Sequence, residues 1–151
     1  MLRMLRVVCV TAVALAVTVP GLGQTLQRTN PPGLSTPRTY SHVVKAGKLL
    51  FIAGQVGVDE KGAVAGATMA GQLDRALSNL EIALKSAGAD LSHVAKTTIY
   101  TTSIAEFSSP EAAAVRAKHM ADNKPANTLV QIQQLARPEF KVEIEAIAVL
   151  P

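Results

Sequence analysis

Apolar positions recur with two different periods along this chain, and each period predicts one kind of element. Over residues 68–87, apolar side chains return every three or four positions, as in a helix with one buried face. Gly88 follows directly and suits the C-terminal end of such a helix. A second helix is predicted over 110–120, where Ser109 can act as N-cap and Pro110 takes the first helical position.

Short apolar runs rich in Val, Ile, Thr and Tyr predict the strands. The runs at 41–46 and 49–53 are joined by Gly47-Lys48 and are interpreted as a β-hairpin. Further strands are predicted at 93–102, 128–135 and 142–149. Residues 54–66 are rich in glycine and are predicted to form a loop, without the order of residues that a phosphate-binding loop needs.

The predicted order is β-β-α-β-α-β-β, which corresponds to an α+β domain with both helices on one face of a mixed sheet. The last strand shows the alternation of side chains most clearly. One face carries Val142, Ile144, Ala146 and Ala148, and the other carries Glu143, Glu145, Ile147 and Val149. Because both faces contain apolar residues and the helices suffice for only one, we expect the second face to meet another copy of the chain.

The first residues have the pattern of a secretory signal peptide. Basic residues precede an uncharged apolar run over 7–19, and Pro20 and small residues follow it. At about 1.5 Å per residue the run reaches roughly 20 Å, which is short of the roughly 30 Å of a bilayer core. We expect cleavage after Gly23, an extended arm or linker over 24–39, and one domain over 40–151. An uncleaved membrane anchor is the alternative.

Removal of this leader changes the composition of the protein. It reduces the 15 basic residues to 13 against 11 acidic ones, a net charge of +2 instead of +4. Aromatic residues make up 3% of the chain, and without a basic run this argues against nucleic-acid binding. The single cysteine, Cys9, lies in the leader. The mature protein, expected to be periplasmic or secreted and free of the membrane, therefore has no thiol chemistry.

Few residues could carry chemistry. The histidines His42, His93 and His119 lack metal-ligand spacing, so we expect no metal site. Glu143 and Glu145 share a strand face that becomes apolar further along. A carboxylate there is either solvated at the strand edge or desolvated in a cleft between subunits. In the second case its pKa would rise, and it could act as a general base.

Four blocks of the sequence, in this order and at this spacing, resemble the Rid family, which is also called the YjgF family. The blocks are Tyr40-Ser-His-Val-Val-Lys-Ala-Gly47, Leu50-Phe-Ile-Ala-Gly-Gln55, Val94-Ala-Lys-Thr-Thr-Ile-Tyr100 and Val142-Glu-Ile-Glu-Ala-Ile-Ala-Val149. The resemblance extends over residues 40–150, nearly the whole predicted domain. Reactive intermediate deaminase A is the type member of the family.

This resemblance implies a chorismate-mutase-like fold and a homotrimer that binds a small-molecule ligand in clefts between its subunits. In the deaminase branch, the cleft hydrolyses 2-imino acids such as 2-iminobutanoate and 2-iminopropanoate to 2-keto acids and ammonia, without a cofactor. A glutamate in the Glu-Ile-Glu strand positions the attacking water, and Glu143 matches it. Tyr40 matches a tyrosine that lines the cleft.

The chain departs from the family pattern at the residue that binds the substrate carboxylate. The family has an arginine in a Pro-Ala-Arg-Ser motif, and this chain has Pro125-Ala-Asn127-Thr128. Because Asn127 offers no guanidinium for a bidentate clamp, weak or absent deamination of 2-iminopropanoate is expected. Arg137 and Lys124 are the nearest candidates in sequence for a substitute cation.

The other matched cleft positions also differ. Ala53 replaces the serine of Ser-Gly-Gln, Glu111 replaces an asparagine, and Leu129 replaces a cysteine. Together, Asn127 and Glu111 would make the cleft about two charges more negative than the family pattern, which would repel an anionic substrate.

Three functions remain open at this point. The first is a Rid-like hydrolase with Glu143 as base, acting on a neutral or cationic imine. The second is a non-enzymatic trimer that binds ligands or acts like a chaperone. The third is ordinary imino-acid deamination with a substitute cation. The absence of an arginine at Asn127 favours the first function over the third. The first and second functions differ in whether activity requires Glu143.

Overall fold

The computed structural model of the chain describes residues 25–151, so the signal peptide predicted over 1–23 lies outside the described residues. The strands are β1 (Gln27–Thr29), β2 (Val43–Ala46), β3 (Leu49–Val56), β4 (Val94–Thr101), β5 (Ala126–Gln131) and β6 (Val142–Val149). The helices are α1 (Met69–Ser86), α2 (Ile104–Phe107) and α3 (Pro110–Met120), with a 3-10 turn η1 (Leu91–His93) before β4. No helix within residues 25–151 is long and apolar enough to cross a membrane.

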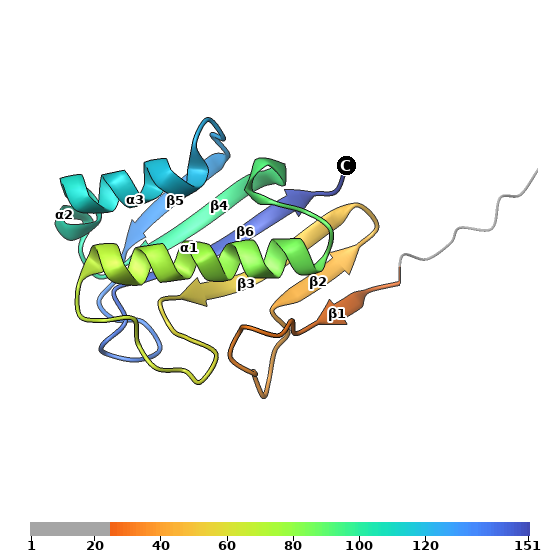
Figure 1. Cartoon of the computed structure of the whole chain (residues 1–151), viewed down its shortest axis with the longest axis horizontal. Helices are drawn as coiled ribbons and strands as arrows, with labels where there is room; N and C mark the ends of the chain where they lie inside the picture. The colour runs from red at the N-terminus through yellow and green to blue at the C-terminus, as the bar shows by residue number, and fades with distance from the viewer. Residues whose placement is uncertain (1–24) are drawn as a thin grey trace, which may run out of the picture.

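The strands form a six-stranded sheet in the order β1-β2-β3-β6-β4-β5. Strands β4 and β5 are parallel, and the other neighbouring pairs are antiparallel. Helices α1 and α3 lie side by side across one face of this sheet (Figure 1). The predicted α+β fold is therefore confirmed, with both long helices on the same face of a mixed sheet.

Helix α1 begins and ends where its local sequence directs. The Thr68 hydroxyl accepts a hydrogen bond from the Gly71 N–H at 3.2 Å and caps the N-terminus. Gly88 follows the last turn with a φ of 81°, a conformation that favours glycine. The inward stripe of α1 is buried against the sheet and consists of Met69, Leu73, Ala76, Leu77, Leu80, Ala83 and Leu84. This stripe is the centre of the core.

The opposite face of the sheet remains apolar and exposed, and we call it the open face. It carries Leu49, Phe51, Val130, Ile147 and Val149, which alternate along their strands with buried core residues. Phe51 and Val149 are 42% and 43% exposed. The predicted alternation in β6 is confirmed, since Val142, Ile144, Ala146 and Ala148 are all buried.

The segment before β2 is more ordered than predicted. Residues 24–39 are expected to form an arm without packed elements, but Gln27–Thr29 pair with β2 and Leu34 is buried in the core. The prediction is wrong in this respect. A strand of three residues is too short to show a hydrophobic period. Strand β1 is held by backbone hydrogen bonds to its neighbour β2, which the sequence pattern does not reveal.

Two strand boundaries also differ from the prediction. Strand β3 continues through the first residues of the expected loop to Val56, and β5 ends at Gln131 instead of extending to residue 135. Both boundaries are set by the neighbouring strand, because β3 is still paired with β6 at Val56 and β5 ends opposite Thr101, the last residue of β4. The short helix α2 has too few residues to show a period.

Gln72 connects α1 to two loops at one end of the sheet. Its Nε2 donates to the carbonyls of Gly66 and Glu139 at 3.1 and 2.9 Å, and its Oε1 accepts from the Lys141 N–H at 2.8 Å. The side chain is 1% exposed. A buried amide with these groups satisfied fixes both loops relative to the helix.

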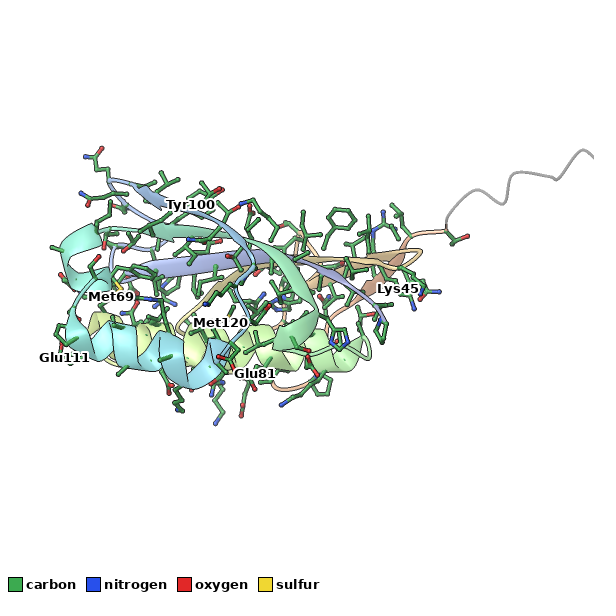
Figure 2. All side chains as sticks on the ribbon, turned by 90° about the horizontal axis from the view of Figure 1, so that it is seen from above. Lys45, Met69, Glu81, Tyr100, Glu111 and Met120 are labelled. Carbon is green, nitrogen blue, oxygen red and sulfur yellow. The ribbon has the colours of Figure 1, made fainter. Side chains whose placement is uncertain are left out.

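An ionic cluster around His119 joins α1 to α3. Its two ring nitrogens lie 2.8 Å from Asp74 Oδ1 and from Glu81 Oε1, and Lys118 Nζ lies 2.9 Å from Asp74 Oδ1. Hydrogen bonds from Lys118 and then from His119 lower the pKa of Asp74. Burial would raise the pKa of Glu81, but hydrogen bonds from His119 and Lys85 outweigh it and the pKa is lowered. Glu81 is labelled in Figure 2.

The Gly57→Ala variant should lower the free energy of unfolding by about 1–3 kcal/mol. An ideal Cβ on Gly57 would lie 2.6 Å from Gln72 Cα and 2.7 Å from the Gln72 carbonyl oxygen, and these backbone atoms cannot move without shifting α1. Urea denaturation measures the loss. Gly54→Ala is the matched control, because its Cβ would meet only the flexible side chain of Glu143. Equal losses in the two variants would contradict this explanation.

The ionic cluster should make stability depend on pH in the acidic range. A carboxyl whose pKa is lowered in the folded state stabilises the protein above its ordinary pKa, and this contribution disappears as the pH falls through the folded value. The stability advantage of the wild type over Asp74→Asn should therefore be full near about pH 5 and shrink toward about pH 3. Chemical denaturation at several pH values tests this, and a constant difference would exclude the mechanism.

Candidate functional site

Glu143 lies in the middle of the sheet, on the side of the open face. Its β6 position is paired with Val56 of β3 and with Tyr100 of β4. The side chain is partly buried, although its neighbour Glu145 on the same face is exposed. Within residues 25–151, the Glu143 carboxylate accepts no hydrogen bond. A carboxylate that is shielded from water and not engaged by the protein is available to a ligand or to a water molecule.

Gly54 makes room for this carboxylate. The pairing of β3 with β6 is irregular between Ile52 and Gln55, and Gly54 lies within this irregularity. An ideal Cβ on Gly54 would lie 1.8 Å from Glu143 Oε1 and 2.6 Å from its Cδ. Only glycine therefore permits the observed position of the carboxylate.

The surroundings of Glu143 change the acidity of two groups. Burial, and then the negative charge of Glu145, raise the pKa of the Glu143 carboxyl above its ordinary value. Burial, and then the charge of Glu143, raise the pKa of the Tyr40 hydroxyl. A carboxyl with a raised pKa can accept and return a proton more effectively near neutral pH than an ordinary glutamate. Glu143 is thus partly desolvated within a single chain.

His42 packs against Tyr40, and Gln55 is hydrogen-bonded to His42. The rings of Tyr40 and His42 meet edge to face with their centroids 5.5 Å apart. The buried His42 has Nε2 2.7 Å from the Ser35 carbonyl, and Nδ1 3.2 Å from Gln55 Nε2. Because the Gln55 nitrogen is a donor, this pattern corresponds to a neutral His42 that donates through Nε2. Sequence spacing could not identify this role, since nothing local links a lone histidine to a glutamine thirteen residues away.

Ala53 lines a separate hollow of about 360 Å³ on the open face. Lys96, Glu145 and Phe51 also line it, together with Thr98. The Ala53 carbonyl accepts a hydrogen bond from Gln55 Nε2 at 2.8 Å. Ala53 directly precedes Gly54, and we call the space that Gly54 leaves for the Glu143 carboxylate the Gly54 notch. Because the charge of Glu143 also acts on Tyr40, the residues Tyr40, Ala53 and Glu143 belong to one region of the protein.

Asn127 lies on the other side of the sheet from Glu143. It pairs with Thr97 in the neighbouring strand, and the Thr97 hydroxyl donates to Asn127 Oδ1 at 2.9 Å. Thr97 is buried beneath the helices, whereas Tyr100, three residues further along β4, pairs with Glu143. Residues three apart in a strand point to opposite faces. A single chain therefore does not bring Asn127 and Glu143 together.

Two other predicted site residues also belong to the helix side. Leu129 packs against the core under the helices. Glu111 is exposed in the first turn of α3, and Figure 2 shows it in the helix layer, away from Tyr100 on the far side of the sheet. The structure thus places Asn127, Leu129 and Glu111 on the helix side of the sheet and Glu143 on the side of the open face.

The two candidate substitute cations have different positions. Arg137 is paired with Glu139 and donates to the Gly62 carbonyl at 2.9 Å, so its guanidinium is already engaged. Lys124 lines a hollow of about 260 Å³ together with Asn127. Arg116 of α3 lines the same hollow, and the sequence analysis missed it because the helical period marks α3 only by its apolar positions.

Comparison with known proteins identifies the family. The sequence model of the family described as Endoribonuclease L-PSP matches residues 33–150. The chain is 36% identical to a RutC family protein of Pyrococcus horikoshii, covering 72% of this chain and 85% of the relative. It is 31% identical to a human 2-iminobutanoate/2-iminopropanoate deaminase, covering 78% of this chain and 83% of the relative.

The chain belongs to the Rid family. Solved structures agree with this assignment. The fold of this Rid chain is similar to that of a YjgF/YER057c/UK114-family protein of Mycobacterium tuberculosis, with a TM-score of 0.68, 31% identity and coverage of 83% and 100% of the two chains. It is also similar to RidA from an Antarctic Psychrobacter, with a TM-score of 0.73, 26% identity and coverage of 82% and 98%.

Charge on Glu143 should destabilise this Rid protein, and Glu143→Gln should relieve the effect. Since the folded pKa is raised, the folded state holds a proton that the unfolded chain has lost, and stability falls as the pH rises above about 4.5. The variant should be more stable than the wild type at about pH 7 and equal to it at about pH 4. Denaturation at both pH values measures the difference, and Glu145→Gln should give a smaller gain because Glu145 is exposed. A variant that is less stable at neutral pH would contradict the raised pKa.

Proposed function

We propose that this protein is a Rid-family hydrolase of C=N bonds in which Glu143 acts on the attacking water. The observation that carries the proposal is the partly buried Glu143 carboxylate in the Gly54 notch, which has a raised pKa and accepts no hydrogen bond from residues 25–151. Relatives that are 31–35% identical carry the names 2-iminobutanoate/2-iminopropanoate deaminase and Reactive Intermediate Deaminase A.

The proposed chemistry needs a base that later returns its proton. Glu143 accepts a proton from water as the water oxygen bonds to the imine carbon and the C=N π electrons move to nitrogen. Glu143 returns this proton to the nitrogen, then takes the proton of the new hydroxyl and passes it to the nitrogen as well, so that ammonia leaves and a ketone remains. A carboxyl with a raised pKa suits both directions of transfer.

The complete site requires a second copy of the chain, and a homotrimer is part of the proposal. Asn127 and Glu143 are on opposite sides of the sheet, so one cleft must combine Glu143 of one subunit with Asn127 of another. The exposed Leu49, Phe51 and Val149 of the open face provide apolar surface for this association.

Asn127 should alter the substrate range. Loss of a charge-assisted pair with a carboxylate costs about 2–5 kcal/mol, or about 10²–10³-fold in binding. The proposal is therefore an enzyme with altered or lost activity toward ordinary 2-imino acids. The alternative that this substitution favours is a trimer that binds a ligand, or acts like a chaperone, without turnover. We place the mature protein outside the cytoplasm, in the periplasm or secreted, after removal of residues 1–23.

Ammonia release from 2-iminopropanoate generated in situ tests the proposal. The mature wild type should be at least about 10²-fold slower than the human relative measured in parallel. Asn127→Arg should recover activity by about tenfold or more, because a guanidinium restores the carboxylate clamp. Glu143→Gln in the Asn127→Arg background should remove the recovered activity.

Each outcome has a distinct meaning. Fast turnover by the wild type would show that Asn127 does not limit activity. Activity that survives Glu143→Gln would overturn the catalytic role of Glu143. A folded Asn127→Arg variant with no turnover would favour the ligand-binding alternative. Asn127→Gln is the matched control for side-chain length without charge, and it should recover no activity.

A further inference from the structure

Asn79 has a buried side-chain oxygen that no protein group within residues 25–151 satisfies. The residue belongs to the buried face of α1 and is 3% exposed. Its Nδ2 donates to the carbonyls of Val56 and Val58 at 3.0 and 2.9 Å, which fixes the orientation of the amide. Oδ1 is then the only buried side-chain nitrogen or oxygen of residues 25–151 without a hydrogen bond. A buried acceptor left unpaired is costly, so a partner is expected.

Asn79 lines a small hollow between α1, β3 and the segment before β2. Figure 1 shows α1 running across the sheet above β3. The hollow leaves about 20 Å³ for the centre of a water molecule, and one water needs about 10–15 Å³ of such space. A larger ligand does not fit. Gln55 and Gly54 border the hollow from β3, and Tyr40 and His42 border it from the segment before β2.

Gln55 supplies a second acceptor at this hollow. Its Nε2 donates to the Ala53 carbonyl at 2.8 Å and lies 3.2 Å from His42 Nδ1. The side chain is 2% exposed, and within residues 25–151 its Oε1 accepts no hydrogen bond. Both amides that line the hollow thus have an engaged nitrogen and an available oxygen. Two acceptors require a molecule with two donor protons, and water meets this requirement within the volume.

The lining of the hollow also argues against a dry cavity and against an ion. Dry cavities in proteins are lined by aliphatic and aromatic groups, whereas two amides, an imidazole and a phenol border this one. No Asp, Glu, Lys or Arg is among its lining residues, so a neutral occupant is favoured.

We propose that this hollow is a binding site for one internal water molecule, which donates to Asn79 Oδ1 and Gln55 Oε1 and so links α1 to β3. Gln55 directly follows Gly54 and is hydrogen-bonded to the His42 ring that packs against Tyr40. The water therefore supports the stretch of β3 that forms the Gly54 notch.

This water is distinct from the one that attacks the imine in the proposed function, because Glu143 does not line the hollow. The inference goes beyond the proposed function and does not require the protein to be a hydrolase. The two proposals can therefore fail separately.

A crystal structure at a resolution that shows ordered waters tests the inference. The wild type should show density for one water within about 2.7–3.2 Å of both Asn79 Oδ1 and Gln55 Oε1. In solution, cross-peaks between water and the Asn79 amide protons should have opposite signs in NOESY and ROESY spectra, as for a long-lived bound water. The exposed Asn30 amide is the control and should show only transient surface water.

Two variants with equal changes of residue type separate this site from buried amides in general. Asn79→Leu removes the acceptor, and the density should be absent from the folded variant. Gln72→Leu is the matched control, because Gln72 is another buried amide of α1 and does not line the hollow. This variant should keep the water.

Several results would overturn the inference. They are absence of the density from the wild type, a water beyond hydrogen-bond distance of Asn79 Oδ1, and density that is unchanged in folded Asn79→Leu. If Asn79→Leu fails to fold, the wild-type density and the NOESY and ROESY signs still decide the question. A water at this site in a protein that releases no ammonia would retain this inference and reject the hydrolase.

Discussion

The alternation of side chains along β6 is the constraint on which the rest of the structure depends. Ile144 and Ala146 enter the core beneath α1, so Glu143 and Glu145 must emerge on the open face. A shift of one residue would bury both carboxylates in the core and expose the residues that hold the helices. The position of Glu143 is therefore fixed by the same core contacts that stabilise the fold. These contacts offset the free-energy cost of keeping a partly buried carboxylate.

The same alternation separates the two halves of the candidate site. Asn127 and Arg116 belong to the helix side of β4 and β5, and Glu143 belongs to the open face. The apolar open face and the divided site thus point to one requirement, which is contact with another copy. In this account, association covers apolar surface and completes the cleft in a single step.

Most of the fold could be predicted from sequence because its long elements have clear periods and ends. Helix α1 has a buried stripe, a Thr68 cap and a following Gly88, and β6 alternates over its whole length. Strand β1 and the burial of Leu34 could not be predicted, because they depend on the backbone and core of a distant neighbour. Glu143 was accessible to sequence reasoning as a polar residue on an apolar face. The roles of Gly54 and His42 depend on contacts across the sheet that no local pattern encodes.

The central claim is that one chain holds only part of each site, and the mass of the purified protein in solution tests this most directly. Sedimentation equilibrium of residues 24–151 should give the mass of three chains, and Phe51→Glu, which places charge on the open face, should shift the population toward a single chain. A wild type that remains a monomer at concentrations well above those used for binding or turnover would contradict the account. Glu143 and Asn127 could not then act on the same ligand.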